Sequence, residues 1–487
     1  MKSMMRISNR PVIVTSLVAV TFAAGCESPL SDSRFGKWIK EDPREWQLSE
    51  GGTVHSRDTL HTRESTSSSE TDEQSAAREL PADSGVADYV AIALTNNPSL
   101  IAARQKIERL GARVPQVTSL DDPMFQIAPI GEMAQTAAGQ VGLMTGISQK
   151  VPWPQKLGVR GDIAEQDVAV AVAELQQKQL QVVRNTRRAY WSYYFTARAI
   201  GLTRESRQLL TQFRDIAQTQ YAAGTRSQAD VLRASVELSE LDNELITLQQ
   251  RQDTARAMLN QLMDRPVTAP LPEPAVIAPQ AIADDLDRLL SQAALNNPAL
   301  KVVQERIKQF RHRRKLAQLA PIPDLTVSLN YNVVNESGLS PVADGDDQWW
   351  LGFGINIPIW FEKYEAAERE ALRGIFENTA ELTAEQNRVA FEVQEALLQV
   401  EAQQRLIELF HDTIVPQAHQ TVEASESGYR AGSVEFLTLI DNWRKMLTYE
   451  LMEHQALVEM EQAVADLERV VGTHVQRRTE EPTDEPK

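Results

Sequence analysis

The sequence predicts a mainly α-helical protein with a membrane β part, built from two tandem structural repeats. Four short markers recur in the same order about 200 residues apart, which indicates an internal duplication. Each copy combines period-two alternation, typical of a β-hairpin, with helical segments much longer than a globular domain is wide. We expect long antiparallel helices that form an α-barrel tube, and two β-hairpins per chain that contribute to a trimeric 12-stranded β-barrel.

The N-terminus resembles a lipoprotein signal peptide, predicted over residues 1–25. The apolar run Pro11–Ala24 follows a basic start and is too short to span a bilayer as a helix. Small residues lead directly into Cys26, the single cysteine, which we expect to be acylated in the mature protein. An ordinary signal peptide with an incidental cysteine is the alternative. The polar residues after Cys26, to residue 84, are predicted to form a flexible tether.

The duplication defines the domain organisation. The first repeat is predicted at 85–265, a Pro-rich linker at 266–280, the second repeat at 281–472 and a polar C-terminal tail at 473–487. The markers are Asn96-Asn97-Pro98-Ser99-Leu100 and Asn296-Asn297-Pro298-Ala299-Leu300, Pro152-Trp153 and Pro358-Ile359-Trp360, and Tyr221 to Thr225 and Tyr429 to Ser433.

Each repeat is predicted to contain one β-hairpin, at about 122–153 and at about 324–360. Apolar and polar residues alternate there over roughly ten positions with aromatic residues near the ends, as in membrane strands. A soluble sandwich would show the same alternation. However, a lone hairpin between long helices is only marginally stable in water and needs another setting.

Each hairpin is followed by a predicted pair of long helices. The first helices span about 155–222 and 361–430, and the second about 228–262 and 434–471. The longest reach on the order of 100 Å at 1.5 Å per residue. Gly224 and Gly432 stand where the chain reverses and can adopt the left-handed conformation of a tight turn.

The number of strands per chain favours a barrel formed by three chains. Two hairpins supply only four strands, and an open sheet edge in lipid is excluded. Two chains would make eight strands, whose interior side chains fill, whereas three chains leave a lumen.

Composition argues against other classes. The net charge of -17 disfavours a nucleic-acid partner; it indicates a soluble surface or, alternatively, a lumen or rim that favours cations. We expect no catalytic residues, no metal site and no cofactor apart from the lipid on Cys26. The seven histidines are scattered, and neither a phosphate-binding loop nor a nucleophile elbow is present.

The order and doubling of these markers resemble the TolC-type outer-membrane efflux protein family over about Val86 to Val471. The resemblance implies a homotrimer with a barrel in outer-membrane lipid and a helical tube in the periplasm. It also implies two partners, a periplasmic adaptor (membrane fusion) protein and an inner-membrane proton-driven efflux pump. The segment Gln149 to Leu157 is most similar to heavy-metal efflux branches.

The resemblance further implies a gate at the tip of the tube, where acidic residues and polar links follow each turn. By position, Asp230 and Asp441 fall on the acidic sites, and Arg226 and Tyr429 on the gating links. Thr438 stands where another carboxylate is expected, so the nearby Glu435 would have to supply that charge. The alternative is that all of these residues lie on a solvated helix surface.

We therefore expect an outer-membrane exit duct that passively conducts small solutes or metal cations from an inner-membrane pump. A type I protein secretion exit duct is an alternative that the sequence does not separate. A lipid-anchored coiled-coil spacer without a pore is the alternative of another class, and it leaves the two alternating hairpins unexplained.

Overall fold

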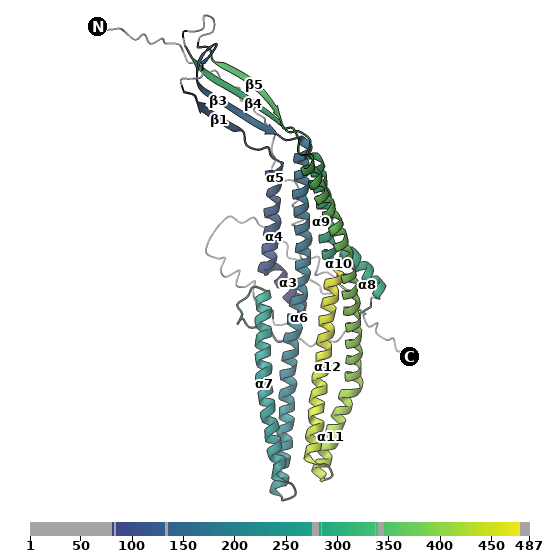
Figure 1. The fold of residues 1–487 in the computed structure, drawn as a ribbon. Coiled ribbons are helices and arrows are strands. Elements are labelled where there is room, and N and C mark those ends of the chain that lie inside the picture. The colour runs from purple at the N-terminus through teal and green to yellow at the C-terminus, as the bar shows by residue number, and fades with distance from the viewer. Residues whose placement is uncertain are drawn as a thin grey trace, which may run out of the picture.

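The computed structural model is a rod of long helices with a small β-sheet at one end (Figure 1). It describes residues 80–81, 84–131, 135–274, 282–283, 285–336, 338 and 345–477. The predicted signal peptide, Cys26 and nearly all of the tether lie outside the described residues.

The two repeats present equivalent elements in the same order. The first contains α3 (Val86–Asn96), α4 (Pro98–Gly111), α5 (Arg113–Thr118), β1 (Met124–Pro129), β2 (Gln135–Thr136), β3 (Gly139–Val151), α6 (Pro154–Ala222) and α7 (Gln228–Leu262). The second contains α8 (Leu286–Asn296), α9 (Pro298–Leu319), β4 (Leu325–Asn335), β5 (Gln348–Ile355), α10 (Phe361–Leu409), a π-helix (Phe410–Ile414), α11 (Val415–Ala431) and α12 (Phe436–Val471). The predicted fold class, mainly helical with a β part and a doubled plan, is confirmed.

The two predicted hairpins join into one antiparallel sheet with the order β1-β3-β4-β5. The short strand β2, which the sequence did not indicate, pairs with β3. Strand β5 ends at Ile355, although the alternation continues to Ile359. The side chain of Asn356 turns to accept a hydrogen bond from the backbone N–H of Asp324, and Pro358 has no N–H for a ladder.

The doubled Asn-Asn-Pro marker ties each short helix to the far end of its repeat. The Asn97 side chain accepts a hydrogen bond from the first turn of α4 and donates one to the Leu262 carbonyl, 2.9 Å away. Asn297 caps α9 in the same way and donates to the Val470 carbonyl at 2.7 Å. The marker recurs because one side chain caps a helix and satisfies a carbonyl at the end of another.

Helix α6 is continuous over 69 residues, on the order of 100 Å. Its counterpart, predicted as one helix over 361–430, is instead interrupted by the π-helix. Trp153 and Gly224 are 71 positions apart, whereas Trp360 and Gly432 are 72 apart. A π-turn holds one residue more than an α-turn, so the π-helix absorbs the extra residue without rotating α11 relative to α10.

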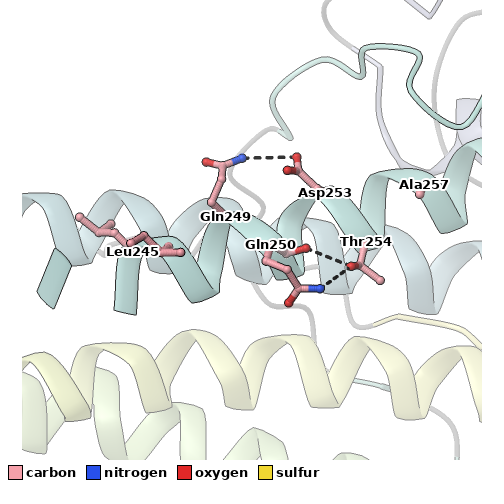
Figure 2. A pocket seen from close by; sticks show the side chains of 7 residues that line it. Leu245, Gln249, Gln250, Asp253, Thr254 and Ala257 are labelled. Atoms are coloured by element: carbon pink, nitrogen blue, oxygen red, sulfur yellow. Dashed lines mark hydrogen bonds between the residues drawn. The ribbon is translucent and has the colours of Figure 1, made fainter. Parts of the chain in front are cut away.

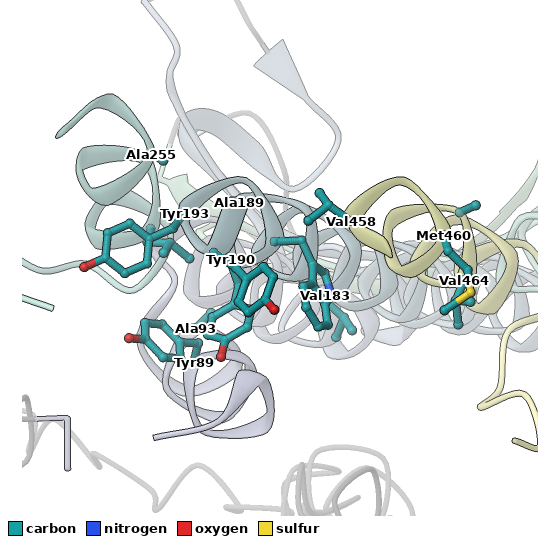
Figure 3. Close-up of a cluster of buried hydrophobic side chains, with 14 of the residues drawn as sticks. Tyr89, Ala93, Val183, Ala189, Tyr190, Tyr193, Ala255, Val458, Met460 and Val464 are labelled. Carbon is teal, nitrogen blue, oxygen red and sulfur yellow. The ribbon is translucent and has the colours of Figure 1, made fainter. Parts of the chain in front are cut away.

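A hydrophobic core joins the two repeats along the middle of the rod (Figure 3). Tyr89 of α3 meets Tyr190 of α6 edge to face, with ring centroids 5.1 Å apart. Val183 of α6 belongs to the same cluster as Val458 and Met460 of α12. The first repeat is therefore packed directly against the second within one chain.

Candidate functional site

The sheet has one mainly apolar face and one face that is richer in small and polar residues. Phe125, Ile147, Leu329 and Leu351 form one row across the four long strands, and each is between 46% and 67% exposed. In the next row, whose side chains point to the other face, Gln126, Gly146 and Asn330 are polar or small, and the fourth position, Trp350, is aromatic. An exposed apolar face opposite a polar one is typical of a membrane strand that lines an aqueous space.

The sheet joins the helices through a buried ion pair. The ammonium of Lys156, near the start of α6, lies 2.8 Å from the carboxylate of Asp324, and these side chains are only 7% and 11% exposed. Lys156 also donates to the Ile322 carbonyl at 2.5 Å, and the backbone N–H of Trp153 donates to Asp324 at 3.4 Å. Burial is the largest single effect on Asp324 and opposes its ionisation. The hydrogen bonds from Lys156, the Trp153 backbone and Lys150, together with the charge of Lys156, outweigh burial and hold the pKa of Asp324 below its usual range.

At the opposite end of the rod, two tight turns lie side by side (Figure 1). Gly224 and Gly432 stand in these turns with φ of 72° and 83°. The Arg226 guanidinium, on the α6–α7 turn, donates to the Val434 carbonyl of the α11–α12 turn at 3.1 Å. It also lies 5.0 Å from the centre of the Tyr429 ring.

Tyr429 links the second turn back to the first repeat. Its ring is fully buried, and its hydroxyl donates to Asp230 of α7 at 3.3 Å. Burial, followed by the charge of Asp230 and this hydrogen bond, raises the pKa of Tyr429 to about 12. The phenol therefore stays protonated near neutral pH and can serve only as the donor to Asp230.

The structure brings together three of the five tip residues that the family resemblance indicated. Asp441 instead pairs with Lys445, one turn along α12, at 2.8 Å, and its side chain is 56% exposed. Glu435 precedes α12 without a side-chain capping bond. The roles of all five in gating remain predictions.

One link near the tip was missed by the sequence reasoning. The Arg444 guanidinium of α12 forms two hydrogen bonds with the Glu237 carboxylate of α7, one of them 2.8 Å long. Such bidentate pairs are among the stronger charged contacts, although Arg444 is half exposed. The sequence offered one signal: Arg444 interrupts the apolar residues that recur at helical spacing, such as Ile440 and Leu447.

The described residues contain no group of three or more His, Cys, Asp or Glu side chains that could hold a metal ion. No described helix is both long and apolar enough to cross a membrane. A shallow groove of about 740 Å³ follows the outer face of α7, lined by residues from Leu245 to Ala257 (Figure 2).

Comparison with known proteins identifies relatives of the whole rod. The family model described as "Outer membrane efflux protein" matches residues 90–265 and 289–473. The cobalt-zinc-cadmium resistance protein CzcC of Cupriavidus metallidurans is 22% identical over 395 residues, which cover 79% of this chain and 88% of that protein.

Solved structures share the fold at low sequence identity. CusC superimposes with a TM-score of 0.69 at 15% identity, covering 80% of this chain and 92% of that chain. VceC, an outer membrane protein of Vibrio cholerae, gives 0.65 at 16% identity, with coverage of 80% and 96%.

Proposed function

Because the chain belongs to the outer membrane efflux protein family, we propose that three copies form the exit duct of a tripartite pump. In this proposal the duct passively conducts small solutes or metal cations. It sits in the outer membrane, anchored by a lipid on Cys26, with its helical tube in the periplasm. Its partners are a periplasmic adaptor protein and a proton-driven pump of the inner membrane.

The sheet carries this proposal. Its apolar rows suit contact with lipid, and its polar face suits a lumen. Both outer strands, β1 and β5, leave backbone groups unpaired along one edge, which lipid does not tolerate. A ring of three such sheets removes every edge and gives twelve long strands, wide enough to leave a lumen.

The similarity to a cobalt-zinc-cadmium resistance protein favours divalent metal cations as the cargo. Such cations would need no dedicated high-affinity site to pass through the duct. Low affinity suits conduction, because a tightly held ion would leave slowly.

Two measurements test the duct. Light scattering in detergent should report a trimer, and planar bilayers should show discrete single-channel currents. A monodisperse monomer with full β-content would overturn the proposal.

The cargo is tested by deleting the gene and measuring growth in Co²⁺, Zn²⁺ and Cd²⁺, with a hydrophobic dye as the control. Metal sensitivity rescued by the wild-type gene is the expected result. Sensitivity to the dye alone would exclude metal cations as the main cargo. Mass spectrometry of the mature N-terminus tests the anchor, and an unmodified Cys26 would contradict it.

A further inference from the structure

The chain contains a complete example of how one repeat meets the next. Strand β3 of the first repeat pairs with β4 of the second, and α6 packs against both α9 and α12. Within the described sheet, β5 of the second repeat and β1 of the first are the two outer strands. Strand β5 is the counterpart of β3, and β1 is the counterpart of β4. The counterparts of the paired strands therefore lie on opposite edges of the sheet, where two copies would meet if the proposed ring forms.

The two repeats can be aligned residue by residue at the sheet. Ser148 pairs with Met124 in the first hairpin, and Ile355 pairs with Leu325 in the second. Ser148 and Ile355 each stand five residues before the tryptophan that ends the hairpin segment. Met124 of β1 therefore corresponds to Leu325 of β4.

Lys363 is the counterpart of the buried Lys156. Each is the third residue of its long helix, and each donates its backbone N–H to the preceding tryptophan carbonyl, at 2.8 Å for Lys156 and 3.2 Å for Lys363. Lys156 pairs with Asp324, directly before β4, whereas Lys363 is exposed, with its ammonium 5.8 Å from the Tyr364 ring centre. Strand β1 is preceded by Asp122-Pro123, the reverse order of Pro323-Asp324 before β4. Pro123 therefore stands at the position equivalent to Asp324, and the nearest carboxylate, Asp122, is one residue earlier and is exposed as well.

A second pair of positions lies along the helices. Within the chain, the Arg184 guanidinium of α6 forms an ion pair with Asp466 of α12. Phe391 follows Trp360 at the distance at which Arg184 follows Trp153, and Met258 follows Gly224 as Asp466 follows Gly432. Both counterparts are apolar, and they are 64% and 49% exposed.

Both members of the Arg184–Asp466 ion pair are replaced by apolar residues at the equivalent positions. A charged pair inside the chain corresponds to two exposed apolar side chains on opposite flanks, as expected if these two residues also meet. The α7 groove includes Thr254, which stands one helical turn before Met258 and so shares its face of α7. Its residue Thr254 corresponds to Gln462, which donates to the Arg188 carbonyl of α6 at 3.4 Å.

We propose that the contact between the repeats is repeated between copies of this chain. Lys363 of one copy pairs with Asp122 of the next, and Phe391 of one copy packs on Met258 of the next, beside the α7 groove. This inference rests on the ring assembly of the proposed function and assigns the residues that make its interface.

Cysteine cross-linking of the full-length protein tests the helical contact. Oxidation of the double variant Phe391→Cys with Met258→Cys should join chains covalently into dimers and trimers on a non-reducing gel. The matched pair Arg184→Cys with Asp466→Cys should form a bond within one chain and leave its mass unchanged. Phe376→Cys with Met258→Cys should not link, because Phe376 lies roughly 22 Å further along the helix.

Charge exchange tests the junction contact. Lys363→Asp or Asp122→Lys alone should raise the dissociation constant of the trimer roughly tenfold or more, because like charges then meet at the interface. The double variant should recover most of the loss, and Lys363→Arg should behave like wild type. A double variant no better than either single one would overturn the ion pair.

The outcomes separate this inference from the duct itself. A wild-type trimer in which Arg184→Cys with Asp466→Cys closes but Phe391→Cys with Met258→Cys does not would overturn the interface and leave the duct intact. A wild-type monomer with full β-content would overturn both.

Discussion

The two repeats share a backbone plan but differ in where their side chains find partners. Lys156 is buried against Asp324 of the same chain, whereas the equivalent Lys363 is exposed. At the tip, Arg226 reaches the Val434 carbonyl, and Val434 occupies the position equivalent to Arg226. The duplication kept the order of the elements, the Asn-Pro caps and the turns, while the residues that face the next repeat diverged because their environments differ.

The long helices differ in a second way. Helix α6 is α-helical throughout, whereas its counterpart contains the π-helix, followed by Pro416 in the first turn of α11. Proline removes an N–H and displaces the carbonyl four residues before it, so a π-turn there is better tolerated than a regular α-turn. The second repeat can therefore accept a change of one residue at its π-helix, whereas the continuous helix α6 of the first repeat cannot.

The largest expected effect comes from deleting one residue in each helix. Removing Ala199 from α6 rotates all that follows by about 100° and carries Leu210 and Phe213, both fully buried, out of the core. We expect no folded trimer. Removing Thr413 together with Pro416→Ala should convert the π-helix to α-helix and keep the fold. Circular dichroism and light scattering measure both, and a folded Ala199 deletion would contradict the comparison.

Lys156→Ala should destabilise the chain, because it leaves the buried Asp324 carboxylate with only the exposed Lys150, whose ammonium lies 3.4 Å away. Loss of one member of a buried pair costs about 3–5 kcal/mol. Lys363→Ala, the matched control, should hardly change the stability of the isolated chain.

The stabilisation from Asp324 should also depend on pH. Since the folded pKa of Asp324 is lowered, its contribution to folding stability is present above the unfolded pKa of about 4 and is lost as the pH falls below it. Urea unfolding at pH 7 and pH 3 tests this, and equal losses for the two variants would refute it.

Arg226→Ala should raise the resting conductance of the channel. The guanidinium holds the α11–α12 turn through the Val434 carbonyl and the Tyr429 ring, so its loss favours the open state. Tyr429→Phe removes only the 3.3 Å hydrogen bond to Asp230 and should have a smaller effect. Planar-bilayer currents provide the measurement, with Val434→Ala as the control that keeps the carbonyl. An unchanged Arg226→Ala channel would place these residues among ordinary surface contacts.

The smallest effect is a pH response confined to the second helix pair. His411 of the π-helix lies 2.8 Å from Glu453 of α12, and this hydrogen bond raises the pKa of His411. The stabilisation is therefore present below the unfolded pKa of about 6.5 and is lost as the pH rises through the folded value. Leu245 occupies the position equivalent to Glu453, so α6 and α7 lack this pair.

Hydrogen exchange, corrected for its intrinsic pH dependence, should show weaker protection at α11 and α12 at pH 8 than at pH 6, and no such change at α7. His411→Gln should remove the part of the difference that depends on Glu453, while the pair of His419 and Glu450, 2.8 Å apart between the same helices, stays in place. A pH response of unchanged size in His411→Gln would assign it to another group.

Local signals were sufficient for much of the fold. The turn glycines, the Asn-Pro caps and the unbroken helical segments predicted the long helices to within a few residues, because caps and turns depend on neighbours in the chain. The alternation predicted the strands for the same reason, since period two expresses the two faces of a sheet. The end of β5 was missed because it depends on the hydrogen bond between Asn356 and the backbone N–H of Asp324, which is far from it in the sequence.

The sequence by itself determined the duplicated plan, the mainly helical class with a β part, and the position of the tip, since each depends on periodicity and short motifs. Only the tertiary structure decided which polar and charged groups meet. Asp230 reaches Tyr429, whereas Asp441 turns to Lys445, and Lys156 finds Asp324 across 168 positions. Such pairs depend on how helices from different repeats are rotated against each other, and that rotation is set by packing of the whole core.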